Sequence, residues 1–306
     1  MNVIATGNES AQIVECYGRR VVLRLADNSR VPAEVFGKRL KVVCGDEVRI
    51  EANPAKHALQ VKEVLPRRSH LTRTDAQGRA EVLAANMTQL AVLISEQPCG
   101  DPFIVDRYLA GAELGDIKAI VIFTKSDLGM SADTQTLMDD YRRAGYDVFN
   151  VSVQQENSLT ALRAILKDEV SMFVGESGVG KSTLTNALLG NQAQLTRELS
   201  DSTGEGRHTT VSSALVPLPN GGALIDSPGV RDYAPPPVSD LQVAFAWREF
   251  RQYAGQCKFN NCLHLREPGC TIIAAVETTA ISARRHESYK RLLNLMRQLL
   301  PSYERR

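Results

Sequence analysis

A glycine-rich stretch followed by a lysine and two hydroxyl residues has the composition of a loop that binds phosphates. It reads Gly-Glu-Ser-Gly-Val-Gly-Lys-Ser-Thr over residues 175–183. Glycines there let backbone N–H groups turn inward around a triphosphate, an approach that side chains would block. The alternative is an ordinary turn before a helix, but an apolar run precedes the stretch and helically spaced leucines follow it. The residues predicted to surround the phosphates are Gly175, Glu176, Ser177, Gly178, Val179, Gly180, Lys181, Ser182 and Thr183.

Three cysteines and a histidine form a second group, in which Cys257, Cys262, His264 and Cys270 fall within 14 residues. Three thiolates and one imidazole complete a tetrahedral set for structural zinc and leave no open position for catalysis. The loop between them has few apolar residues, so we expect its folding to need the metal. Clustered cysteines beside a histidine favour one structural Zn²⁺ in a reducing compartment over free buried thiols or disulfides.

A third group follows the apolar run at residues 119–123 and reads Thr124-Lys125-Ser126-Asp127. The Asp127 carboxylate can accept hydrogen bonds from guanine N1–H and the exocyclic amine, whereas adenine presents no matching donor pair. Asp127 would therefore select GTP over ATP, with Lys125 along the base, and Ser152 at the next strand end would place backbone N–H groups near guanine O6. For the tetrapeptide alone, a strand-end turn with a helix cap at Ser126 or Asp127 is an open alternative.

A fourth group, after the glycine-rich loop, consists of candidates for sensing the γ-phosphate. Asp226 begins an Asp-Ser-Pro-Gly run and is expected to orient Mg²⁺ through water. The Gly229 N–H would sense the γ-phosphate, and Thr210 would join Ser182 in the magnesium shell when GTP is bound. Val230 stands where many GTPases keep a water-orienting glutamine, so we expect slow intrinsic hydrolysis.

The elements that must position these groups are a small barrel and a larger α/β unit. Short β-branched runs at 13–17, 20–25, 30–35, 46–50 and 59–64, separated by turn residues, fit an OB-type β-barrel, although an SH3-like barrel has the same pattern. OB barrels often bind nucleic acid. The basic residues that we expect to contact phosphates there are Arg19, Arg20, Arg24, Lys38, Arg39 and Lys41.

Apolar runs then alternate with helical stretches, which predicts a doubly wound, mostly parallel sheet with helices on both faces. The runs are 90–94, 119–123 and 148–151, and the helices lie near 103–113, 135–144 and 158–167. Ligands bind such sheets at the carboxyl ends of the strands, where the third group lies. A last helix is expected from Thr279 to Leu300, and we favour RNA contact over a merely solvated face for its basic residues Arg284, Arg285, Lys290, Arg291 and Arg297.

We divide the chain of 306 residues into a barrel domain (1–68), an α/β domain (69–237) and a helical zinc-binding domain (238–306). Residues 1–71 carry twelve Lys/Arg against eight Asp/Glu, residues 72–240 thirteen against twenty-two, and residues 241–306 eleven against five. The two basic ends are expected to face a polyanion. We expect no membrane contact, a cytoplasmic monomer and no secretory signal within residues 1–12.

These elements resemble the GTPase signature in an altered order, with the guanine-reading motif before the phosphate loop, which is a circular permutation. With a barrel in front and a Cys/His cluster behind, the chain resembles the ribosome small-subunit-dependent GTPase A family over about residues 13–300. The matching motifs are Gly-Glu-Ser-Gly-Val-Gly-Lys-Ser, Gly-Arg-His-Thr-Thr, Asp-Ser-Pro-Gly and the cysteine cluster. Thr124 and Val153 depart from the Asn and Ala that are usual in the family, and Thr124 is expected to weaken guanine affinity without losing specificity.

The resemblance implies a GTP hydrolase of late 30S ribosomal subunit assembly, with Zn²⁺ and Mg²⁺ as cofactors. Its partners would be the small subunit, its rRNA, GTP/GDP and another assembly factor. It also implies that the subunit stimulates hydrolysis, and His208 is a candidate to position the water, with an ordinary exposed histidine as the alternative. The open alternatives are a P-loop NTPase outside ribosome assembly and a zinc-dependent RNA-binding protein. The predicted catalytic residues are Lys181, Ser182, Thr210, Gly229 and His208.

Overall fold

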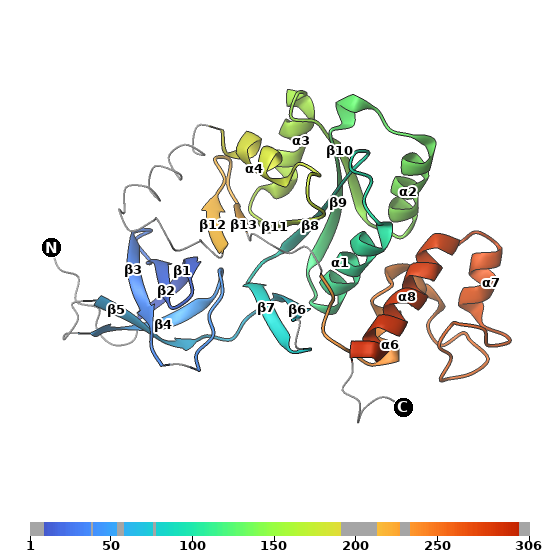
Figure 1. Cartoon of the computed structure of the whole chain (residues 1–306), viewed down its shortest axis with the longest axis horizontal. Coiled ribbons are helices and arrows are strands. Elements are labelled where there is room, and N and C mark those ends of the chain that lie inside the picture. The colour runs from blue at the N-terminus through green and yellow to red at the C-terminus, as the bar shows by residue number, and fades with distance from the viewer. Residues whose placement is uncertain are drawn as a thin grey trace.

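The computed structural model describes residues 9–37, 39–53, 58–75, 78–190, 213–226 and 233–299. Figure 1 shows three units in a row: a blue barrel, a central sheet flanked by green and yellow helices, and an orange-red helical unit. Among the described residues, no helix has both the length and the apolar character needed to cross a membrane.

The barrel consists of five short strands that close on themselves. β1 pairs with both β2 and β4, while β3 runs parallel to β5, so no edge is left open. Alternate residues such as Ile13, Leu23 and Ile50 are fully buried inside. The predicted five-stranded barrel is thus confirmed. Its strands are β1 (Glu9–Tyr17), β2 (Arg20–Arg24), β3 (Arg30–Val35), β4 (Glu47–Asn53) and β5 (Ala58–Val64).

The central unit follows a two-stranded hairpin and contains a sheet in the order β10-β9-β8-β11-β13-β12. Neighbours in this sheet are parallel except for β12, which is antiparallel to β13. The mostly parallel sheet is therefore confirmed. The strands are β6 (His70–Thr74), β7 (Ala80–Ala85), β8 (Gln89–Ser95), β9 (Lys118–Thr124), β10 (Asp147–Val151), β11 (Val170–Val174), β12 (Ser213–Pro217) and β13 (Ala223–Asp226).

Helices cover both faces of this sheet because its strands are apolar on both sides. Helices α1 (Pro102–Leu114) and α2 (Ala132–Arg143) pack on the face that carries Val121 and Phe123. Helices α3 (Glu156–Leu166) and α4 (Lys181–Leu189) pack on the opposite face. The three predicted helices of this unit are α1, α2 and α3, each within a few residues of its expected bounds.

Strand β12 joins the barrel to the central sheet, which the sequence did not predict. It pairs antiparallel with β1, with Cys16 opposite Ser213 and Glu15 opposite Ala214. The barrel and the α/β unit therefore share one continuous sheet of 11 strands. A fixed backbone connection of this kind restricts rotation between the two units.

The C-terminal unit packs short helices around Trp247, Phe250 and Tyr289. Its last helix begins at Ala283, later than the expected Thr279, since Thr279 adopts a left-handed φ of 60° that no helix can include. The elements are α6 (Asp240–Phe245), the 3₁₀ segment η2 (Arg248–Tyr253), α7 (Thr271–Glu277) and α8 (Ala283–Leu299).

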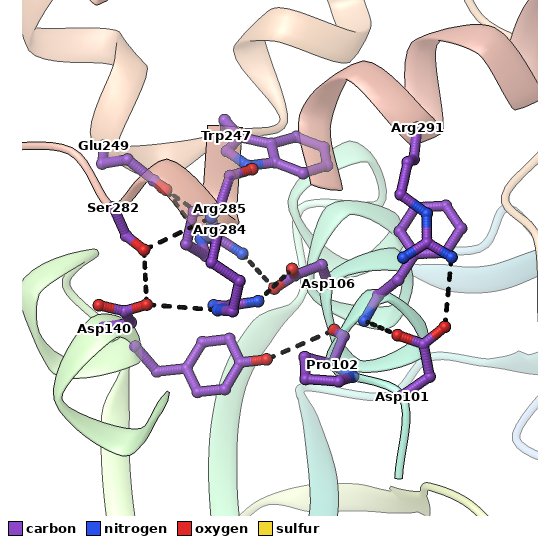
Figure 2. Close-up of polar contacts among 12 residues, drawn as sticks. Asp101, Pro102, Asp106, Asp140, Trp247, Glu249, Ser282, Arg284, Arg285 and Arg291 are labelled. Carbon is purple, nitrogen blue, oxygen red and sulfur yellow. Dashed lines mark hydrogen bonds and ion pairs between the residues drawn. The ribbon is translucent and has the colours of Figure 1, made fainter. Parts of the chain in front are cut away.

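The expected basic surface of the last helix is wrong for Arg284 and Arg285. Arg285 is 2% exposed and binds Asp106 and Glu249, and Arg284 binds Asp106 and Asp140. Figure 2 shows both guanidinium groups pointing at carboxylates rather than at solvent. These two arginines attach α8 to the central unit, because a buried charge needs a partner.

Candidate nucleotide and metal sites

The glycine-rich loop lies between β11 and α4, as its sequence predicts. Gly175, Gly178 and Gly180 have φ values of 140°, 85° and 99°, a region that side chains rarely adopt. A Cβ on Gly175 would lie 2.4 Å from the Leu93 carbonyl oxygen, too close for any other residue. The loop can therefore take this shape only with glycine at these positions.

Lys181 is the first residue of α4, and its side chain folds back over the loop. Its Nζ lies 2.7 Å from the Gly175 carbonyl oxygen and 2.6 Å from that of Glu176. Ser182 and Thr183 follow in the first turn of the helix and are exposed. The N-terminus of a helix favours anions, so the ammonium group, the hydroxyl groups and the helix end together suit a polyphosphate.

The third group meets this loop at the end of β9. The Thr124 hydroxyl lies 2.5 Å from the Val179 carbonyl oxygen, and the Lys125 Nζ lies 2.9 Å from that of Gly178. Lys125 has a left-handed φ of 55°, and Ser126 begins the short 3₁₀ segment η1 (Ser126–Leu128) that contains Asp127. Residues more than fifty positions apart thus lie side by side. Strand β8 pairs in parallel with both β9 and β11, so the carboxyl ends of the three strands lie together.

Ser152 directly follows β10, and its hydroxyl group contacts Asp127. Its Oγ donates to the Asp127 carboxylate at 2.5 Å, whereas its N–H donates to the Ser158 hydroxyl at 3.0 Å. This hydrogen bond from Ser152 restricts the orientation of the Asp127 carboxylate. We expected Ser152 to place backbone N–H groups near guanine O6. Its Oγ accepts the Gln154 N–H at 3.0 Å, and the contact with guanine stays a prediction.

Asp226 ends β13, which lies next to β11 and therefore near the phosphate loop. Desolvation raises the pKa of its carboxyl group, and the positive charge of Lys181 opposes this shift. Carboxylate and hydroxyl oxygens are the ligands that Mg²⁺ prefers, so Asp226 and Ser182 suit that ion. Thr210, Gly229, His208 and Val230 lie outside the described residues.

The Cys/His cluster is already arranged for a metal ion. The four ligand atoms lie within 4.8 Å of one another. Cys257 Sγ is 3.6 Å from His264 Nδ1 and 3.9 Å from Cys270 Sγ, and His264 Nδ1 is 3.4 Å from Cys270 Sγ. Tetrahedral zinc with ordinary bond lengths places a nitrogen and a sulfur ligand about 3.5 Å apart and two sulfur ligands about 3.8 Å apart, close to these three distances. Soft thiolates at this spacing fit Zn²⁺ better than a hard cation.

Residues around the cluster hold the ligand loop in shape, and sequence reasoning missed them. Glu267 accepts backbone N–H groups from Leu263 at 2.9 Å and Leu265 at 2.8 Å. Although burial opposes the shift, these bonds lower the pKa of Glu267 to about 2. His286 of α8 bonds the His264 carbonyl oxygen at 2.7 Å. In the sequence, a role for Glu267 was indicated only by its position between two of the four cluster residues.

Comparisons with known proteins agree with this arrangement. The model of the RsgA GTPase family matches residues 64–234. A protein of Shewanella oneidensis named small ribosomal subunit biogenesis GTPase RsgA is 36% identical over 294 residues, covering 93% of this chain and 83% of its own. A protein of the same name from Neisseria gonorrhoeae is 37% identical over 280 residues, covering 92% of this chain and 90% of its own.

Two solved structures have the same fold. YjeQ from Thermotoga maritima matches with a TM-score of 0.73 and 23% identity, over 94% of this chain and 98% of that chain. YloQ, described as a circularly permuted GTPase, matches with a TM-score of 0.73 and 23% identity, over 99% of this chain and 100% of that chain. The permuted order and the barrel are therefore confirmed, and the chain belongs to the RsgA GTPase family.

Proposed function

We propose that this chain hydrolyses GTP during assembly of the small ribosomal subunit. The observation that carries the proposal is the contact between the base-reading segment and the phosphate loop, in which Lys125 Nζ lies 2.9 Å from the Gly178 carbonyl oxygen. The segment after β9 thereby places a guanine acceptor, Asp127, close to a loop that can hold a polyphosphate. The names of the relatives support the ribosomal context.

Different residues of the described part of the chain would bind the phosphates, the metal ion and the base of GTP. Lys181 would lie against the β- and γ-phosphates, and Ser182 and Asp226 would hold Mg²⁺ directly and through water. Asp127, oriented by Ser152, would accept the two guanine donors. Bound Mg²⁺ would neutralise charge developing on the phosphates. We assign Thr210 and Gly229 to γ-phosphate sensing and His208 to positioning the attacking water.

We propose that the barrel (1–68) and the helical unit (238–306) bind rRNA on either side of the GTPase domain (69–237). Arg39 and Lys41 are exposed on the barrel and can contact phosphates. One Zn²⁺ held by Cys257, Cys262, His264 and Cys270 would stabilise the helical unit. We also propose a cytoplasmic monomer that acts beside another assembly factor.

The nucleotide state would control docking on the subunit through the segment that follows Asp226. Its far end is described at Tyr233, which stacks on Tyr108 of α1 with ring centroids 4.6 Å apart. Tyr233 is buried and lies a few residues before the start of the helical unit at residue 238. A change in this segment on GTP hydrolysis would therefore reach the proposed RNA-binding unit.

The decisive experiment measures turnover of the full chain with and without small ribosomal subunits. We expect slow intrinsic hydrolysis, stimulation by subunits, and competition for binding by GDP but not by ATP. Lys181→Ala should reduce turnover at least about 100-fold, because it removes the main cation of the phosphate site. Lys118→Ala, an exposed lysine far from the loop in sequence, is the matched control. Full stimulated turnover in Lys181→Ala would refute the assignment.

The same measurements separate the two alternatives. Competition by ATP equal to that by GTP would indicate a P-loop NTPase of another kind. Guanine binding without stimulation by subunits would indicate an RNA-binding protein in which the nucleotide site is a scaffold.

A further inference from the structure

The phosphate loop contains an acidic residue, Glu176, whose charge would repel nucleotide phosphates. The structure holds this side chain on the neighbouring helix. Glu176 Oε1 accepts the backbone N–H of Asp101 at 2.9 Å. A Cβ on Gly100 would lie 3.0 Å from the Glu176 carboxyl carbon, so a glycine beside Asp101 leaves the carboxylate room. The contact keeps the negative charge bound to an N–H donor.

Asp101 is in turn held by two further contacts. It is the N-cap of α1, and its Oδ1 accepts the Phe103 N–H at 2.9 Å. Its Oδ2 lies 3.3 Å from Nη2 of Arg291 in α8, and the Arg291 guanidinium lies 4.1 Å from the centroid of the Phe103 ring. Figure 2 shows Arg291 reaching down from α8 to the Asp101 carboxylate. A path of three side chains thus joins the helical unit to the phosphate loop.

The other contacts between α8 and the central unit are of a different kind. Arg285 is almost fully buried against Asp106 and Glu249, and a buried pair of this type is costly to break. Arg291 and Asp101 are 50% and 46% exposed, and an exposed pair breaks easily. The buried pair of Arg285 with Asp106 therefore fixes α8 on α1, whereas small movements of α8 would make or release the contact of Arg291 with Asp101.

We propose that Arg291 is a positioning residue for the phosphate loop. It holds the Asp101 N-cap so that the Glu176 carboxylate stays on the Asp101 N–H and away from the nucleotide phosphates. The helical unit thereby tunes nucleotide affinity, and linkage requires that bound nucleotide strengthens the contact of α8 in return. This inference rests on the proposed binding of GTP at the loop.

The test is a fluorescence titration of the full chain with GDP and with a non-hydrolysable GTP analogue. Arg291→Ala should weaken both affinities roughly two- to fivefold, the range of an exposed ion pair. Lys290→Ala is the matched control, since Lys290 is the next residue of α8 and pairs with Glu287 within that helix. Both variants should keep the thermal stability of the parent chain. Equal affinities in the two variants would overturn the inference.

A second variant tests the route through Glu176. Glu176→Gln keeps an oxygen that can accept the Asp101 N–H but removes the charge, so the effect of Arg291→Ala should fall below about 1.5-fold in that background. An unchanged effect would show that Arg291 acts by another route and would overturn the proposal. If the parent chain binds GTP and only these variant effects are missing, the inference fails alone. If the parent chain binds no guanine nucleotide, the proposed function fails with it.

Discussion

The proposed nucleotide site and the Cys/His cluster draw their residues from the chain in opposite ways. The nucleotide site collects side chains from β9, η1, β13 and the loop after β11, which lie up to about a hundred residues apart and are held by a buried sheet. The cluster takes all four ligands from residues 257–270, in a stretch where 254–270 has only turns and bends. A scaffold of strands positions the first site before any ligand binds. The second is expected to depend on its ion.

The largest effect should come from removing the metal ion, because the fold of the ligand loop is expected to depend on it. Cys270→Ser should lower metal content and unfold the region around 257–299, because structural zinc supplies about 10–16 kcal/mol in small zinc domains. Guanine nucleotide affinity should change far less. Amide hydrogen exchange and metal analysis measure both regions in one sample.

Cys99→Ser is the control for that variant, because Cys99 is an exposed cysteine outside the cluster. Normal protection of 257–299 in metal-free Cys270→Ser would show that the helical core around Trp247 folds without the ion. The difference between the two sites would then disappear.

A smaller effect is expected where α8 of the helical unit contacts α1 of the central unit. Arg285→Ala leaves Glu249 buried without its cation and Asp106 with Arg284 alone, and should cost about 3–5 kcal/mol of unfolding free energy. Arg142→Ala removes an exposed pair with Asp139 and should cost no more than about 1 kcal/mol. Urea unfolding followed by Trp247 fluorescence measures both, and similar losses in the two variants would contradict the assigned burial.

The smallest effect should be local to the proposed nucleotide site. Thr124→Val removes the hydroxyl that contacts the carbonyl oxygens of Val179 and Ile94, which should cost about 1 kcal/mol and weaken guanine affinity about fivefold. Thr124→Ser keeps the hydroxyl and should bind as the parent does. Titration with GDP distinguishes the two variants. Equal affinity in Thr124→Val and Thr124→Ser would show that the hydroxyl contact with the phosphate loop does not affect binding.

The structure indicates a role for Thr124, which stands where the family usually has Asn. From the sequence, weaker guanine affinity is expected with threonine at this position. In the fold, its hydroxyl joins the base-reading segment to the phosphate loop through Val179. The side chain thus has a tethering role that depends on two segments meeting, and its effect on affinity stays a prediction.

The sequence alone determined the features that depend on short segments. The alternation of β-branched residues indicated the barrel, the apolar runs indicated the parallel sheet, and spacing indicated the phosphate loop and the Cys/His cluster. Such signals are readable because a strand period, a glycine turn or a ligand spacing is set by neighbours along the chain.

Tertiary structure alone decided the features that need distant segments to meet. Three contacts between residues far apart in sequence are examples: the pairing of β12 with β1, the buried ion pair of Arg285 with Asp106, and the contact of Arg291 with Asp101. An arginine has the same charge on a solvated face as in a buried ion pair, so its sequence context cannot distinguish the two. Only the packing of α8 against α1 determines which charges are buried, because desolvation and pairing depend on what lies opposite in space.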